Sequence, residues 1–174
     1  MKMRIPTTQE WDRLMDAVQE DNDRAHWEKM FSWVHDPNFE ETSPSLRVYR
    51  GYISARNISW NWPSVRYPDT GFRPAFDTLE TDALASGLQI GDSVVIGTLY
   101  MGDKPVKVPQ NPVYNGDIAD YIPGAKLELR ETLGDSAYQV TAIKVGKVLI
   151  ADRCLLRHIS WDDIADRCLL SNCR

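Results

Sequence analysis

The stretch from residue 56 to residue 70 carries side chains that suit recognition better than bond-making chemistry. Rigid aromatic rings provide contact area, and amide and guanidinium groups provide hydrogen bonds, a combination typical of binding surfaces. The candidate binding residues are Arg56, Asn57, Trp60, Asn61, Trp62, Arg66 and Tyr67. The alternative is that Trp60 and Trp62 simply pack into the core of the protein.

The cysteines and histidines do not have the spacing of a metal site. All three cysteines lie at or after residue 154, and neither a Cys-x₂-Cys pair nor a His-x₃-His pair occurs. Cys154 and His158 have a suggestive spacing for zinc, but two ligands do not make a site. We therefore expect no metal, no cofactor and reduced structural thiols.

Common catalytic motifs are missing from the sequence. It has no Gly-x-Ser-x-Gly turn for a nucleophilic serine and no glycine-rich loop for phosphate groups. Asp and Glu are plentiful, but the sequence alone cannot pair two of them across a cleft. We therefore favour a non-catalytic protein, with an enzyme whose site lies in a cleft between two halves of the chain as the alternative.

Acidic residues are concentrated in residues 10–28, which contain seven Asp and Glu residues and only two Lys or Arg residues, Arg13 and Arg24. The net charge of the chain is −5, and no basic cluster offsets it. Nucleic acid is therefore not an expected partner. A helix with a solvated acidic face is the simplest interpretation. The alternative is an acidic inhibitor that presents helix 10–28 to a basic partner.

A helix should begin at Thr7 or Thr8, because Thr7 and Glu10 have the spacing of a capping box. Its buried face is predicted from apolar residues at helical spacing: Trp11, Leu14, Met15 and Val18. Strands and loops follow the local alternation of apolar and polar residues and the positions of Pro. The predicted strands cover residues 31–34, 46–52 and 71–76, and the predicted loops cover 37–44 and 56–70, the latter without a clean period.

The second half of the chain consists of short β-type runs divided by Gly, Pro, Asn and Asp. Such runs favour a small antiparallel sheet or barrel. Ser160 and Asp163 predict a capped helix near the C-terminal end. The heptapeptide at 150–156 recurs at 164–170, and we interpret it as a duplication that forms a strand first and a helix second.

Three segments in order resemble one known family. They are Arg4–Trp11 (RIPTTQEW), Arg47–Tyr52 (RVYRGY) and Gly71–Arg73 (GFR). Together they resemble the core of the formylglycine-generating-enzyme-like branch of the C-type-lectin fold. The resemblance implies that Arg50 and Arg73 hold carboxylates or carbonyls, and that the ligand face lies in the stretch before Gly71.

The departures from this family matter for function. Its oxidases need a cysteine pair late in the lectin-like core to hold copper, and residues 1–153 contain no cysteine. Its iron-dependent relatives need a histidine cluster, which this chain lacks. The second glycine and the tryptophan that follow Arg50 in the family are absent, as are the N-terminal strand and helix. The resemblance therefore implies a truncated, non-catalytic unit.

We predict an α+β protein with two units. A truncated C-type-lectin-like unit covers residues 1–82, and a small antiparallel β-rich, barrel-like unit with a C-terminal helix covers 83–174. The predicted function is binding of a protein or small ligand through the 56–70 loop, in a chain from a phage or mobile element as the resemblance suggests. An open sheet edge would require close docking of the units or a homodimer. No signal peptide or membrane span is visible, so we expect a cytoplasmic protein.

Overall fold

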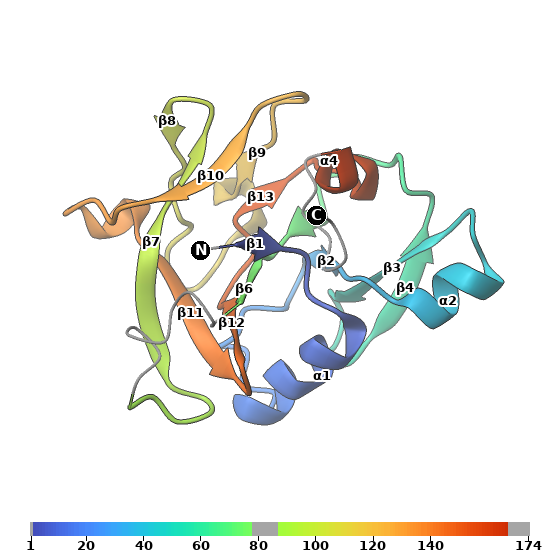
Figure 1. Ribbon diagram of the computed structural model, residues 1–174, viewed down its shortest axis with the longest axis horizontal. Coiled ribbons are helices and arrows are strands. Elements are labelled where there is room, and N and C mark those ends of the chain that lie inside the picture. Colours follow the sequence, from blue (N-terminus) through green and yellow to red (C-terminus); the bar gives the residue numbers. More distant parts are fainter. Residues whose placement is uncertain (1, 78–86, 167–174) are drawn as a thin grey trace.

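The structure is a computed structural model that describes residues 2–77 and 87–166 of the 174-residue chain. Within these ranges the fold is mixed α+β, as predicted, with a curled antiparallel sheet, a second sheet and a C-terminal helix (Figure 1). The helical elements are α1 (Thr8–Ala17), α2 (Pro37–Thr42), α4 (Trp161–Asp166) and the short 3₁₀ turns η2 (Asn115–Asp117) and η3 (Ser136–Tyr138).

The described strands form two sheets. The first has the order β1 (Met3–Arg4), β6 (Ala75–Asp77), β12 (Val148–Ala151), β11 (Val140–Val145), β7 (Ser93–Met101) and β10 (Leu127–Arg130), and β8 (Lys104–Pro105) also pairs with β7. The second has the order β4 (Ile58–Asn61), β3 (Arg47–Gly51), β2 (Phe31–Trp33), β5 (Thr70–Phe72), β13 (Leu156–Arg157) and β9 (Ala119–Asp120). Figure 1 shows β7, β8 and β10 at one end of the molecule and β3, β4 and α2 at the other.

The two halves of the sequence share both sheets. Strands β1 and β6 from the first half complete the sheet of β7, β11 and β12, and strands β9 and β13 from the second half complete the sheet of β2, β3 and β4. A large apolar cluster likewise runs from Met3 to Ile164. The predicted division at residues 82 and 83 therefore separates segments of sequence that lie together in space.

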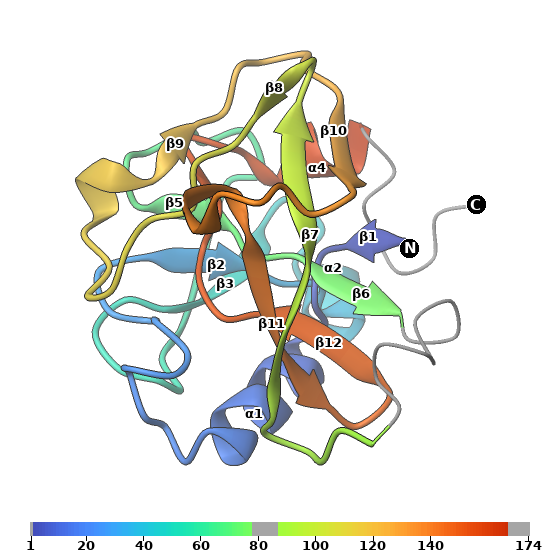
Figure 2. The same cartoon turned by 90° about the vertical axis from the view of Figure 1, so that its left-hand side faces the viewer.

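Helix α1 begins as the sequence predicts. Thr7 accepts a hydrogen bond from the Glu10 backbone, and the Glu10 carboxylate accepts one from the Thr7 backbone. The predicted apolar face is fully buried and packs on β11, β12 and β3, and Figure 2 shows α1 at the ends of β11 and β12. The helix over residues 10–28 that the inhibitor alternative needs does not form as one element, because α1 ends at Ala17 and Gln19 and Glu20 take positive φ values of 56° and 57°, which stop a right-handed helix.

Residues 37–44 were predicted to form a loop, and this is wrong for most of the segment. Asp36 caps helix α2 by accepting a hydrogen bond from the Phe39 backbone, and Pro37 occupies the first turn. Proline is favourable there because the first helical N–H groups lack intrahelical partners in any case. The residue that looked like a loop marker is therefore a helix-start residue.

The two arginines of the family-like segments have the structural role that was expected. Arg50 bonds the Asp12 carboxylate and the backbone carbonyls of Thr8 and Asn57, and Arg73 bonds the carbonyls of His26 and Ala151. Both arginine side chains are almost fully buried, where an unpaired charge would be costly. They tie the sheets to the segments that cover them.

Gly51 has a steric reason to be glycine. Its φ is 92°, and a Cβ atom there would lie 3.1 Å from the Met30 carbonyl oxygen and 3.2 Å from that of Trp27. Only glycine adopts this conformation without strain.

The repeated heptapeptide takes two structures, as predicted. In the first copy, Ile150 and Ala151 end β12 and Leu156 begins β13, whereas Ile164–Asp166 of the second copy lie in α4. Residues 167–170 of the second copy lie outside the described residues. Helix α4 starts with the predicted cap, since Ser160 and Asp163 exchange hydrogen bonds of 2.9 and 3.0 Å.

Candidate functional site

The stretch predicted to be a loop contains β4, which lies at one edge of its sheet. β4 pairs antiparallel with β3, with Trp60 opposite Val48 and Ile58 opposite Arg50. Aromatic and β-branched residues favour an extended strand. The prediction of a loop over 56–70 is therefore wrong for Ile58–Asn61. The missed signal was the alternation of Ile58, Trp60 and Trp62, which is a period of two.

These three side chains form one exposed apolar row. Ile58, Trp60 and Trp62 are 54%, 55% and 58% exposed. Ile58 and Trp60 are two residues apart on β4 and point to the same face, and Trp62 directly follows the strand. We name this row the β4 strip. The centroid of the Trp60 ring lies 6.0 Å from that of Phe39 in α2. Trp60 and Trp62 therefore do not pack into the core, and Ile58 joins the candidate residues.

The backbone of β4 has an outward side as well. Gly51 donates a hydrogen bond to the Asn57 carbonyl, which makes this pair a hydrogen-bonded pair of the ladder. Hydrogen-bonded and non-hydrogen-bonded pairs alternate in an antiparallel ladder, so the backbone N–H and C=O groups of Ser59 and Asn61 point toward β3. The N–H and C=O groups of Ile58 and Trp60 consequently point away from the sheet. No other described strand pairs with this edge.

Arg56, at the start of β4, is held by the fold rather than offered to a ligand. Its guanidinium forms ion pairs with Asp12, Asp16 and Glu20 of the α1 segment. Its hydrogen bond to Glu20, and to a smaller extent its hydrogen bond to Asp16, raise the pKa of Arg56. The sequence analysis identified the residue but not this internal role.

Two amides of the candidate set are also structural. Asn57 donates to the Gly51 carbonyl at 2.9 Å and helps to turn the chain into β4. Asn61 donates to the Tyr49 hydroxyl at 3.3 Å, and its side-chain oxygen accepts the Trp62 N–H at 2.8 Å. Both amides therefore hold the strand in place beneath the β4 strip.

The segment after β4 is anchored to α4. Arg66 makes two hydrogen bonds to the Asp163 carboxylate, at 2.6 and 2.8 Å. Burial raises the pKa of Asp163, but the bonds from Arg66 and from Ser160 outweigh it and hold the pKa below its usual value. Tyr67 is half exposed, and its backbone carbonyl accepts hydrogen bonds from Thr70. Of the predicted set, Trp60, Trp62 and Tyr67 are thus the aromatic residues open to a partner.

The acidic segment is less available than its composition suggested. Asp12, Asp16 and Glu20 are paired with Arg56, and Asp12 also binds Arg50. These carboxylates do not form a free row along a helix, because α1 ends before residue 20. The inhibitor alternative therefore loses the continuous acidic helix on which it depended.

A hollow of about 280 Å³ lies between segments of the two halves, where the enzyme alternative expected a site. It is lined by Asn22, Asp23, His26, Glu28, Lys29, Pro112, Val113 and Tyr114. Burial lowers the pKa of His26 to about 4, so its ring is neutral at pH 7. The His26 Nε2 atom is buried and has no hydrogen-bond partner among the described residues. His26 therefore borders the hollow while its Nε2 atom is shielded from solvent.

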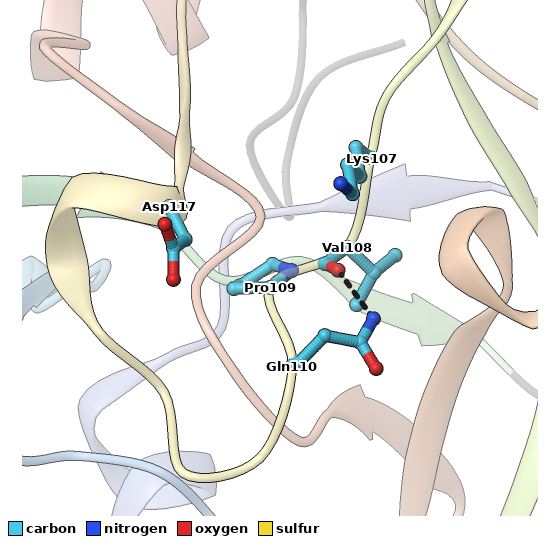
Figure 3. A pocket seen from close by; sticks show the side chains of 5 residues that line it. All are labelled: Lys107, Val108, Pro109, Gln110 and Asp117. Carbon is cyan, nitrogen blue, oxygen red and sulfur yellow. Dashed lines mark hydrogen bonds between the residues drawn. The ribbon is translucent and has the colours of Figure 1, made fainter.

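Other hollows flank the loop after β8. One of about 190 Å³ is lined by Lys107, Val108, Pro109, Gln110 and Asp117. Figure 3 shows Lys107 and Asp117 on opposite sides of Pro109, and the Gln110 amide donating to the Val108 carbonyl at 3.3 Å. A third, of about 200 Å³, shares Val108, Pro109 and Gln110 with it and is also lined by Arg153. These three hollows are smaller than the roughly 300–1,000 Å³ usual for small-molecule sites.

Residues that could have bound zinc have other contacts. The Cys154 Sγ atom lies 3.0 Å from the Ser32 hydroxyl in the core, and burial raises the pKa of its thiol. The His158 Nδ1 atom lies 2.7 Å from the Asp120 carboxylate. Within residues 2–77 and 87–166, no three His, Cys, Asp or Glu side chains gather as a metal site. Cys168 and Cys173 lie outside these ranges.

Comparisons with known proteins do not assign the chain to a family. No family model matches it, and no curated protein or solved structure matches it either. In the described part of the chain, none of the helices has the length and apolar character needed to cross a membrane. The surface itself therefore has to support any statement about function.

Proposed function

We propose that this chain is a non-catalytic binding protein that engages a partner protein through the β4 strip. The observation that carries the proposal is the exposure of Ile58, Trp60 and Trp62 along an unpaired sheet edge. Tryptophan at an interface buries a large area and loses little side-chain entropy. Because the strip is a flat strand edge rather than a cavity, a protein surface fits it better than a small molecule does.

The charged neighbours support presentation of the strip. Arg56 is bound to α1 at one end, and Arg66 is bound to α4 beyond the other. The aromatic row is therefore held by ion pairs that do not themselves occupy the binding face. The resemblance to the lectin-like family points to the same stretch, since its ligand face precedes the Gly-Phe-Arg segment. A truncated lectin-like binding unit remains part of this proposal.

The experiment compares partner capture by the wild-type chain and by a Trp60→Ala/Trp62→Ala variant. Because both rings are more than half exposed, the variant should fold normally by circular dichroism. We expect at least about tenfold weaker recovery of a specific partner, since aromatic hot spots typically contribute 2 kcal/mol or more. Tyr114→Ala is the matched control, because Tyr114 is also more than half exposed but lies in a different segment.

Direct binding of the purified partner must then show the same order of affinities. Equal affinity of the double variant and the wild-type chain would contradict the proposal. A loss that Tyr114→Ala reproduces would contradict it too, because the effect would then not belong to the β4 strip.

A further inference from the structure

The β4 edge lacks the devices that keep sheet edges apart. Proteins usually protect an edge with charges, prolines, bulges or very short strands. Here residues 57–65 contain no charged residue, and the first proline, Pro63, comes after the strand has ended. The Ile58 and Trp60 backbone groups point outward beside an apolar row. An edge of this kind is suited to accept another strand.

We infer that this edge, when its partner protein is not bound, pairs antiparallel with β4 of a second copy of this chain across a twofold axis, so that the second copy and the partner protein compete for it. The inference rests on the proposed function of the β4 strip as a binding surface. A twofold contact needs a patch that is complementary to itself. The strip meets this condition, since apolar side chains recur at every second position whichever way the strand is read. The absence of local charge also removes repulsion between two identical edges.

The register follows from which backbone groups are free. The Trp62 N–H is bonded to the Asn61 side chain at 2.8 Å, and the Trp62 carbonyl accepts the Val65 N–H at 3.3 Å. This leaves Ile58 and Trp60 to form the new ladder. An axis at Ser59 places Ile58 of each copy opposite Trp60 of the other, and all four intermolecular hydrogen bonds then use free groups.

The side chains fit this register as well. Each Ile58 lies against the Trp60 ring of the other copy, on the same face of the joined sheet. Trp62 lies next to the turn that carries the other copy's Arg56. The same register keeps the two Arg56 side chains at opposite ends of the pair.

The size of the contact predicts a reversible dimer. Six half-exposed apolar side chains offer roughly 600–800 Å² in total, given the 150–250 Å² that one aromatic side chain buries. This is less than the roughly 1,200–2,000 Å² of a standard stable interface. The dimer should therefore form as the protein concentration rises rather than be permanent.

Cysteine cross-linking of the full-length chain tests the register. Ser59→Cys is made in a Cys168→Ser/Cys173→Ser background, which leaves only the buried Cys154. At the axis, the two Cα atoms of residue 59 would be about 4.5 Å apart, within disulfide range. Asn61→Cys is the control, because its two copies would be separated by four positions, roughly 13 Å along the strand.

We expect mild oxidation to link Ser59→Cys chains into dimers and to leave Asn61→Cys chains as monomers. Sedimentation velocity over about a hundredfold range of concentration should show the unlinked chain shifting from monomer to dimer. A monomer at every concentration, or equal linkage of both variants, would overturn the inference. Linkage only in a mixture of the two variants would move the axis to Trp60 and overturn the register.

The failure of this inference differs from the failure of the proposed function. A monomeric chain that still loses its partner protein when Trp60 and Trp62 are replaced contradicts the dimer alone. A chain that dimerises through Ser59 but binds its partner protein unchanged after those replacements contradicts the proposed function alone.

Discussion

β4 and β9 lie at opposite edges of the same sheet and differ in length and in charge. β9 has two residues, and its Asp120 bonds Arg157 at 2.8 Å and His158 at 2.7 Å. β4 has four residues, and its exposed side chains are aliphatic or aromatic. A short edge that carries charge resists pairing, whereas a longer apolar edge invites it.

The edges of the other sheet resemble β9 rather than β4. On β1, Arg4 is bonded to Glu10 and Asp77. On β10, Glu128 and Arg130 form an ion pair at 3.2 Å. The same chain thus carries charged side chains on the edge strands β1, β9 and β10 and has none on β4. This difference is the physical reason to regard β4 as an interface rather than as ordinary exposed surface.

The largest effect is expected at the protected β1 edge. Arg4→Met removes a guanidinium that bonds both oxygens of Glu10, at 2.7 and 2.8 Å, in a buried setting. Loss of one partner of a buried ion pair typically costs about 3–5 kcal/mol of unfolding free energy, because the other charge is left uncompensated. Urea denaturation measures it, and Arg13→Met on the exposed side of α1 should change stability by less than about 0.5 kcal/mol. Equal effects would show that the Arg4 ion pairs contribute no special stability.

The second largest effect on stability is expected at the ion pair between Arg66 and Asp163, which anchors the segment after β4 to α4. Asp163→Ala removes both bonds to Arg66 and the capping partner of Ser160. A lost cap costs about 0.5–2 kcal/mol, and Arg66 is exposed enough to regain water, so we expect about 1–2 kcal/mol in total. Thermal unfolding is the readout, and Asp162→Ala, one residue away and exposed, is the control. If Asp162→Ala were as destabilising, the ion pair would not be what anchors the segment.

A charge placed on the β4 edge should weaken dimer formation without changing the stability of the monomer. Ile58→Lys gives β4 the protection that the other edges have, and we expect the dimer dissociation constant to rise about tenfold or more. Because Ile58 is exposed, the stability of the monomer should change by less than about 0.5 kcal/mol. Ile90→Lys is the matched control, since Ile90 is also exposed but lies away from this edge. Analytical ultracentrifugation of both variants measures the difference, and unchanged dimerisation of Ile58→Lys would contradict the role of the edge.

Local signals predicted the helix starts and the buried helical face, but they did not predict how far elements extend. The pairs Thr7 with Glu10 and Ser160 with Asp163 cap their helices by contacts within three residues, so sequence spacing is sufficient. The end of α1 depends on positive φ at non-glycine residues, which no composition rule indicates. Helix α2 was missed because Pro37 was interpreted as a breaker rather than as a first-turn residue.

The candidate site was predicted only in part. The types of its residues are visible in the sequence, but the residues that they contact in the fold are not. Trp60 and Trp62 were identified from side-chain chemistry, and their exposure separates them from core tryptophans such as Trp11 and Trp33. The partners of Arg56 lie about forty residues away in sequence. Such long-range pairing, like the sharing of both sheets by the two halves, cannot be deduced from local patterns.

The smallest effect on stability is expected at the charged β9 edge. The stabilisation that the Asp120 carboxylate provides there should be lost in acid. Hydrogen bonding from His158, together with the Arg157 guanidinium, holds the pKa of Asp120 below its usual value. A carboxylate whose pKa is lower in the folded state stabilises the protein above its unfolded pKa, and this contribution is lost as the pH falls through the folded value. Because Asp120 is largely exposed, Asp120→Asn should cost less than about 0.5 kcal/mol at pH 7 and nothing in strong acid. Urea titrations at several pH values should show the difference between wild type and variant closing below about pH 4, the usual range of an Asp pKa. A constant difference would mean that shape, not charge, protects this edge, and the contrast with β4 would then rest on strand length alone.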